Sequence, residues 1–437
     1  MNEKTLLYIW LSSTLRPGSK AHKILLEHFG TIEKIYAAEK QDYAPLPITS
    51  GEKVALCNKN LDTAKRYMDF CINNKVGILC YEDPYYPERL KIIENPPAMF
   101  YYKGRLINFD DYPCITMVGT RSCSERGFRL AYCSGYDAAS KGAVIVNGLA
   151  LGIDGACIAG ALDANGYAIG LLGCGIDRVY PLGNKDLFER LCASGLILSE
   201  FSPFSEPLGS NFPIRNRVIS ALSVATVVFE AGEGSGAMIT ASHALQQGRR
   251  IFAVPGKPYD KSYAGPLELI KDGATVFTEA DDVLTEYSMN FPHRINLANI
   301  NTVPKDKLDA YVARYFKKDT DPDAPVNRRY VPKVPTEQNS VQPQQAAYQA
   351  KPAPAPLHKP FEKHPEEVKA VETQADLSVL SVAEKQIYTF LSENGSLSSD
   401  ELAQMGLKID DILSALTLLE IYGLIKAVPG GKYEIIK

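Results

Sequence analysis

Between residues 110 and 290, short apolar runs alternate with longer stretches that have a helical pattern. The runs are Cys114–Val118, Ala143–Val146, Tyr167–Leu172, Gly195–Leu198, Val224–Phe229, Ile251–Val254 and Ala274–Phe277. Runs that are almost wholly apolar are typical of strands buried on both faces, and the intervening stretches are long enough for crossover helices. The alternation therefore predicts an α/β domain with a doubly wound parallel sheet. One more strand, at 77–81, and a Pro-rich connection lead into it and are expected to extend the same sheet.

The rest of the chain divides by composition into three further zones. Residues 1–75 read as a small helical module that resembles a helix–hairpin–helix or SAM-like unit, either a binding module or a plain packing domain. Its expected helices are Lys4–Ser13, Lys20–Phe29, Thr31–Ala38 and Leu61–Asn73. Residues 76–299 form the α/β domain. Residues 300–375 hold 11 of the 28 prolines and several Gln- and Ala-rich stretches, which predicts a disordered linker. In 376–437, three helical runs precede a Gly-Gly turn flanked by short β-like runs, the order of a winged helix.

Charge and composition exclude several classes of protein. The formal net charge is −4, which excludes a histone-like protein whose whole surface is basic and binds phosphate. This net charge is compatible with a local basic groove. No run of 18 apolar residues occurs, and no signal peptide is recognisable, which predicts a protein without a membrane span. The nine cysteines contain no CxxC pair, which favours buried thiols in a reduced cytoplasmic protein.

The first candidate loop follows the strand 114–118 and opens a helix. Gly119 allows a tight turn, and free N–H groups at the helix start attract an anion. Arg121, at the strand tip, adds a fork-shaped donor suited to phosphate. An ordinary surface ion pair for Arg121 is the alternative. The GxGxxG pattern is lacking, which disfavours a bound dinucleotide.

A second candidate segment enters a helix after residue 211. Arg215, Asn216 and Arg217 stand near the expected helix start, where cations are unfavourable. This local cost suggests an anionic ligand. Phe212 either stacks on a base or packs as an ordinary core residue.

A third segment, Glu230–Gly236, is glycine-rich and runs into a helix. Ser235 and Gly236 at that start are expected to form an anion-binding nest. The segment is not a P-loop, because no Gly-Lys-Ser/Thr follows, and it is not a nucleophile elbow.

No catalytic set or metal site emerges from the sequence. The six histidines are scattered, without partners at metal-ligand spacing. The acidic residues at strand ends, Asp154, Asp177, Glu200 and Glu230, are expected to bond loop amides or the arginines. Several anion-binding loops, convergent arginines and no nucleophile favour binding over catalysis, with no cofactor.

Seven motifs in order resemble one known family. They are Val118-Gly-Thr-Arg121, Asn147-Gly-Leu-Ala-Leu-Gly-Ile-Asp154, Gly173-Cys-Gly-Ile-Asp177 with Tyr180-Pro181, Ser199-Glu200, Phe212-Pro-Ile-Arg-Asn-Arg217, Ser235-Gly-Ala-Met-Ile-Thr240 and Val254-Pro-Gly256. Together they resemble the DNA processing protein A family (DprA, also called Smf), strongly over about 80–290. Leu151 departs from the pattern, since many members carry a polar or basic residue there.

The resemblance implies an extended Rossmann domain that dimerises and binds single-stranded DNA during natural transformation, and that hands the strand to a RecA-type recombinase. It also implies that Arg121, Phe212, Arg215, Asn216 and Arg217 form much of the DNA groove. No enzymatic activity is implied. The alternative is a nucleotide-binding enzyme resembling the phosphoribohydrolases, motivated by Glu230 and the loop 232–236, and a third hypothesis is a pure scaffold.

The tail is expected to contact protein rather than duplex DNA. Residues 376–437 carry nine acidic and five basic residues, and the would-be recognition helix holds Asp410, Asp411 and Glu420. A helix that reads duplex DNA normally presents cations and amides to phosphates and base edges. A DNA-binding wing using Lys426 and Lys432 is the alternative.

Overall fold

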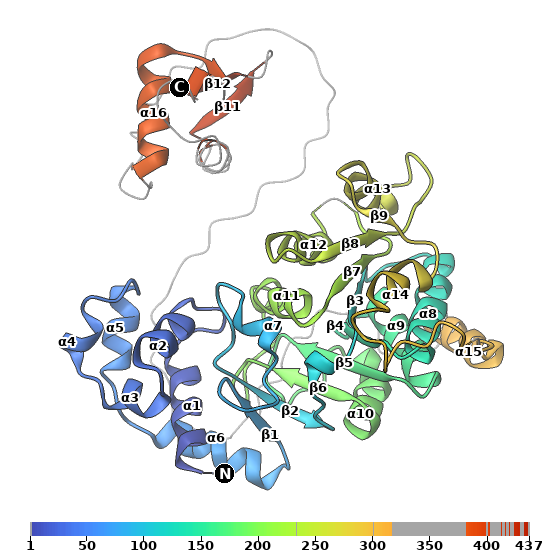
Figure 1. Ribbon diagram of the computed structural model, residues 1–437, viewed down its shortest axis with the longest axis horizontal. Helices are drawn as coiled ribbons and strands as arrows, with labels where there is room; N and C mark the ends of the chain where they lie inside the picture. The colour runs from blue at the N-terminus through green and yellow to red at the C-terminus, as the bar shows by residue number, and fades with distance from the viewer. Residues whose placement is uncertain are drawn as a thin grey trace, which may run out of the picture. The chain divides into compact units, whose positions relative to one another are not determined.

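The computed structural model describes residues 2–232, 234–299, 301–316, 382–398, 401–402, 412, 416, 419, 424–428 and 432–435. The chain divides into two compact units, residues 1–333 and 334–437. In the first unit, helices pack on both sides and at one end of a central sheet (Figure 1).

The sheet has nine strands in the order β1-β2-β6-β5-β4-β3-β7-β8-β9. They are β1 Gly77–Cys80, β2 Met99–Gly104, β3 Cys114–Val118, β4 Val144–Asn147, β5 Tyr167–Leu172, β6 Leu196–Ser199, β7 Ala225–Val228, β8 Arg250–Ala253 and β9 Thr275–Val276. The strands from β3 to β9 pair in parallel, whereas β2 is antiparallel to both β1 and β6. The predicted doubly wound α/β fold is confirmed, with an antiparallel extension at one edge.

The helices of the first unit lie between and around these strands. They are α1 Glu3–Thr14, α2 Ala21–Phe29, α3 Ile32–Ala37, α4 Lys40–Tyr43, α5 Ser50–Leu56, α6 Asp62–Asn73, α7 Glu88–Lys91, α8 Glu125–Ser140, α9 Ile153–Asp163, α10 Lys185–Ser194, α11 Asn211–Leu222, α12 Gly236–Gln246, α13 Ala264–Lys271, α14 Asp281–Tyr287 and α15 Lys305–Phe316.

Alternate residues of the central strands face two different cores. Cys114, Val144 and Val146 pack with α11, whereas Ile115 and Ile145 pack with α8 and α9. Successive side chains of a strand point to opposite faces of the sheet, and helices cover both faces. This is why the strands appear in the sequence as continuous apolar runs.

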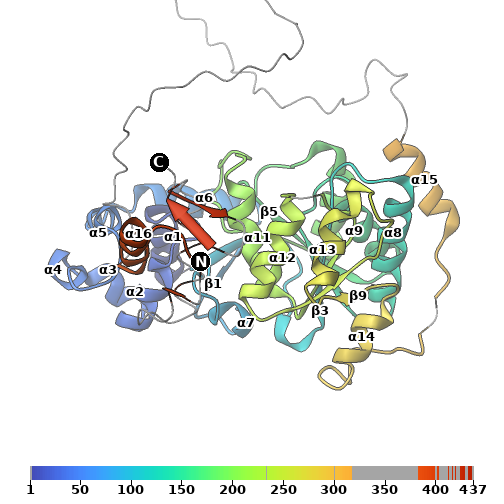
Figure 2. The ribbon, with the colours of Figure 1, turned by 90° about the horizontal axis from the view of Figure 1, so that it is seen from above.

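The helical region at the N-terminus lies beside β1 in both views (Figures 1 and 2). Tyr8, Trp10 and Tyr43 are at most 2% exposed and form its core. The four predicted helices are confirmed. Two short ones, α4 and α5, were missed, although the capping box of Thr49 and Glu52 marks the start of α5.

Two differences from the sequence prediction bear on the site. The strand β2 lies within the segment that was expected to be a Pro-rich connection. The prediction that the linker begins at residue 300 was wrong, because α15 packs against α8 and buries Leu308 and Val312. Residues 317–375 of that predicted linker lie outside the described residues.

The second unit has the fold of a winged helix. Helix α16, Val382–Asn394, packs with a three-stranded antiparallel sheet of order β10-β12-β11, formed by Leu397–Ser398, Lys432–Ile435 and Ile425–Val428. Its core includes Ile387, Leu391 and Ile425.

Only part of the prediction for the tail can be compared with the structure. The acidic residues of the expected recognition helix lie outside the described residues. Both lysines of the alternative wing are paired, Lys426 with Glu434 at 3.0 Å and Lys432 with Glu401 at 3.1 Å. In the described part of the chain, no helix is long and apolar enough to cross a membrane.

Candidate nucleic-acid interface

The candidate site lies where the strand order of the sheet reverses. Strand β3 is flanked by β4 on one side and β7 on the other. The loops that leave β3 and β7 therefore diverge at their carboxyl ends and open a crevice, which is the usual ligand site of such sheets. Gly119 and Arg121 follow β3, and the glycine-rich segment that contains Ser235 follows β7.

A hollow of about 530 Å³, which we call the Phe212 hollow, occupies this crevice. Four of the predicted site residues line it: Arg121, Phe212, Asn216 and Gly236. The other lining residues are Tyr180, Pro207, Gly209, Pro213 and Ile239. The structure thus brings the loops after β3 and β7 together with the first turns of α11 and α12.

Aromatic rings and a guanidinium form the centre of the hollow. Phe212 is half-buried, and its ring stacks on Tyr180 with 5.6 Å between centroids and an interplanar angle of 26°. The Arg121 guanidinium carbon lies 5.3 Å from the Phe212 centroid, a cation–π contact. Arg121 is exposed, and its guanidinium has no hydrogen bond or ion pair with any described residue. The predicted alternative, a surface ion pair, is therefore not what the structure shows.

Arg215 lies behind this cluster rather than on its surface. Its Nη1 donates to the carbonyl oxygens of Gly148, at 3.1 Å, and Leu171, and its guanidinium carbon is 5.8 Å from the Phe212 centroid. Burial lowers its pKa to about 10, while the neighbouring Asp154 acts in the opposite direction. Arg215 therefore holds the ends of β4 and β5 beneath the Phe212 ring.

Asn216 joins the starts of two helices. Its Nδ2 donates to the carbonyl oxygen of Gly236 at 3.1 Å, and its Oδ1 accepts a hydrogen bond from Arg215 Nε at 3.1 Å. Ser235, the N-cap of α12, has a hydroxyl without a partner among the described residues. The start of α12 therefore adjoins the hollow with donors still available to a ligand.

Arg217 does not line this hollow. Its Nη2 is 2.8 Å from Glu200 Oε1, and the two side chains are 3% and 4% exposed. The unfavourable placement of cations near the start of α11 is thus offset by Glu200 and by the carbonyls that Arg215 contacts. An anionic ligand is not needed to explain it.

The start of α8 is neutralised by the protein itself. Ser124 caps the helix by accepting the Gly127 N–H at 3.0 Å, and the buried Glu230 accepts the Ser124 N–H at 2.8 Å. A Cβ at Gly119 would lie 2.6 Å from Ile153, so glycine is required there for packing. The anion site predicted at this helix start is filled by a carboxylate, and Arg121 alone of that loop reaches the hollow.

Comparison with known proteins agrees with these features. The family model of DNA recombination-mediator protein A matches residues 77–288, and that of the DprA winged helix domain matches residues 371–431. Protein Smf of Synechocystis is 31% identical over 424 residues, which span 94% of each chain. The chain belongs to the DprA/Smf family.

Two further relatives are similar over part of the chain. DprA of Bacillus subtilis is 39% identical over 201 residues, 46% of this chain and 68% of that one. The crystal structure of DprA from Streptococcus pneumoniae aligns with a TM-score of 0.56 and 28% identity, covering 65% of this chain and 98% of that chain. The role of this DprA/Smf protein is therefore in DNA processing.

Sequence reasoning missed two supports of the site. Sequence reasoning places Tyr180 only in a family motif, because its stacking on Phe212 depends on two segments far apart in the sequence. Tyr315 of α15 donates a hydrogen bond to the Arg121 carbonyl, and α15 lies in the predicted linker. Among the described residues, no group of three His, Cys, Asp or Glu side chains is placed to hold a metal ion.

The buried carboxyl of Asp154 gives a pH prediction. Burial raises its pKa from 3.8 to about 6, although Arg215 and backbone N–H groups oppose the shift. A pKa higher in the folded protein gives stability that is complete below about pH 3.8 and is lost as the pH rises through about 6. We expect the free energy of unfolding of the wild type, minus that of Asp154→Asn, to fall across this window. Urea denaturation of both proteins at several pH values measures this difference, and a flat profile would contradict the prediction.

Proposed function

We propose that this DprA/Smf protein binds single-stranded DNA at the Phe212 hollow, protects the strand taken up in natural transformation, and passes it to a RecA-type recombinase in the cytoplasm. The observation that carries the DNA-binding part is the Arg121 guanidinium, which lies over the Phe212 ring and has no ion pair with a described residue. We also propose that the protein forms a homodimer. The recombinase, the homodimer and the link to transformation rest on family membership alone.

The chemistry of the hollow suits an unpaired strand. Flat groups, the rings of Phe212 and Tyr180 and the guanidinium of Arg121, offer stacking surfaces that accept any base. In a duplex these base faces are already covered by neighbouring base pairs. The exposed cation and the open start of α12 attract the backbone phosphates. The combination favours single strands with little preference for sequence.

The position of Glu230 argues against the alternative of a phosphoribohydrolase-like enzyme, which this residue motivated. Glu230 is 1% exposed and accepts hydrogen bonds from Ser124 and, at 3.2 Å, from the Tyr263 hydroxyl. A carboxylate held this way supports the loop after β7 and is not available to a substrate.

Titration of the full chain with fluorescent oligo-dT, and with a duplex of the same length, tests the proposal. We expect single strands to bind at least about tenfold more tightly at 0.1 M salt, with an affinity that falls as salt rises. Equal or tighter binding of the duplex would overturn it.

A further inference from the structure

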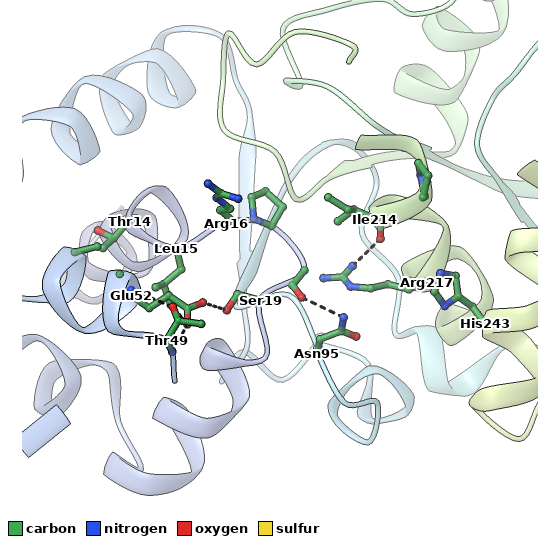
Figure 3. Close-up of a pocket in the computed structure, with 15 residues that line it drawn as sticks. Thr14, Leu15, Arg16, Ser19, Thr49, Glu52, Asn95, Ile214, Arg217 and His243 are labelled. Atoms are coloured by element: carbon green, nitrogen blue, oxygen red, sulfur yellow. Dashed lines mark hydrogen bonds between the residues drawn. The ribbon is translucent and has the colours of Figure 1, made fainter. Parts of the chain in front are cut away.

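A second and larger cavity lies where the helical region meets the α/β domain (Figure 3). Its volume of about 910 Å³ is in the range of ligand pockets, roughly 300–1,000 Å³. We call it the junction cavity. One wall is residues 14–19 and part of α5, and the other is the first turns of α11 together with His243 of α12.

The junction cavity adjoins the Phe212 hollow. Pro213 lines both of them, while its neighbours Phe212 and Ile214 line one each. The hollow and the junction cavity therefore lie on either side of the same turn of α11, close enough for neighbouring nucleotides of one strand to be considered for both.

The lining is mainly apolar, with a few polar groups. Apolar contacts come from Leu15, Pro17, Ala55, Pro213 and Ile214. The Nε of Arg217 is buried and has no hydrogen-bond partner among the described residues. Because the Arg217 side chain is only 3% exposed, a ligand in the cavity would contact mainly the apolar side chains and the exposed Arg16.

Charges in the junction cavity are nearly balanced, which distinguishes it from a phosphate site. Arg16 is exposed and unpaired among the described residues, whereas Arg217 is matched by Glu200. Burial acts to raise the pKa of Glu52, but hydrogen bonds from Ser19 and Thr49 outweigh it, and the lowered pKa keeps this carboxylate ionised. Burial and Arg217 lower the pKa of His243, so its ring is neutral.

We propose that the junction cavity receives a nucleobase of the strand whose neighbouring nucleotide lies at the Phe212 hollow. The inference rests on the proposed function and adds a second subsite to it. A base is flat and uncharged, which fits a mainly apolar cavity with nearly balanced charge. Arg16 at the cavity wall then contacts the phosphate or stacks on the base.

Photo-cross-linking of the wild-type full chain is the direct test. An oligo-dT with 4-thiothymidine at one position per strand is irradiated, and the labelled peptides are identified. We expect one position to label the Phe212 segment and an adjacent position to label residues 14–19 or 49–55.

Filling the cavity gives a second readout. Gly51 lines the cavity, and a Cβ built there has no atom within 4 Å, so a larger side chain can begin at this position, and Gly51→Trp is the variant chosen to fill the cavity. We expect it to abolish the junction cross-link and to weaken oligo-dT binding about tenfold, since it removes a base contact. The matched control is Val54→Trp on the same helix, because Val54 is 69% exposed and does not line the cavity.

The outcomes separate this inference from the proposed function. Labelling of the Phe212 segment alone, or equal affinities of the two tryptophan variants, would overturn the second subsite and leave the first intact. A wild-type protein that bound no oligo-dT would overturn the proposed function itself.

Discussion

Arg217→Ala is expected to lower the free energy of unfolding of the first unit by about 3–5 kcal/mol. The substitution leaves the carboxylate of Glu200 buried without its cation. Glu200 Oε1 also accepts the N–H of Gly18 at 3.0 Å, so the same carboxylate joins the helical region to the α/β domain. The loss is therefore expected to loosen this junction as well as the start of α11.

The single tryptophan makes this measurement selective. Trp10 is 2% exposed in the core of the helical region, and its indole N–H donates to the Asn58 carbonyl at 2.9 Å. Urea denaturation followed by its fluorescence reports the first unit rather than the winged helix.

Arg250→Ala is the control for the Arg217 prediction. Arg250 pairs with Glu286 at 2.8 Å, but the side chains are 56% and 37% exposed. Solvent screens such a pair, so its removal is expected to cost less than about 1 kcal/mol. If Arg217→Ala were no more destabilising than Arg250→Ala, the structural role given to the buried pair would be wrong.

The sequence predicted the sheet well because its central strands are buried on both faces. An almost wholly apolar run, such as the one that contains Ile115 and Met117, has to be covered on both faces, and a parallel sheet between two layers of helices provides this. The strand β2 was missed because prolines precede it and because its pairing with β6 joins segments far apart in the chain. Helix α15 was missed because the surrounding proline content outweighed a local pattern, Leu308 and Val312, that has helical spacing.

The candidate site shows where local reasoning ends. Arg215, Asn216 and Arg217 are adjacent in the sequence, and successive residues on a helix point about 100° apart. The three side chains therefore meet different partners: strand-end carbonyls, the Gly236 carbonyl and the Glu200 carboxylate. The sequence indicates that cations gather near the start of α11. Only the fold shows that Arg217 is buried and paired, whereas Arg121 is exposed.

Arg121→Ala is expected to weaken oligo-dT binding by about 10- to 100-fold and to leave the stability of the protein almost unchanged. The exposed guanidinium has no ion pair to lose among the described residues, so its removal costs little folding energy. Loss of one phosphate contact should also reduce the slope of log affinity against log salt by about 0.7.

Phe212→Ala is expected to cost about 1–3 kcal/mol of binding without that change in slope, because stacking releases no counterions. Fluorescence anisotropy at four or more salt concentrations measures both quantities.

Arg129→Ala removes the same charge from the surface of α8 and is the matched control. Arg129 pairs with Glu125 and Asp309 and does not line the hollow, so affinity and salt slope should stay near those of the wild type. Wild-type affinity in an Arg121→Ala, Phe212→Ala double variant would show that the strand binds elsewhere. A loss of affinity equal to that of Arg129→Ala would show that net charge, rather than the guanidinium over the ring, governs binding. The prediction is that Arg121 acts by position, since it is the exposed cation that the structure places directly on an aromatic surface of the crevice.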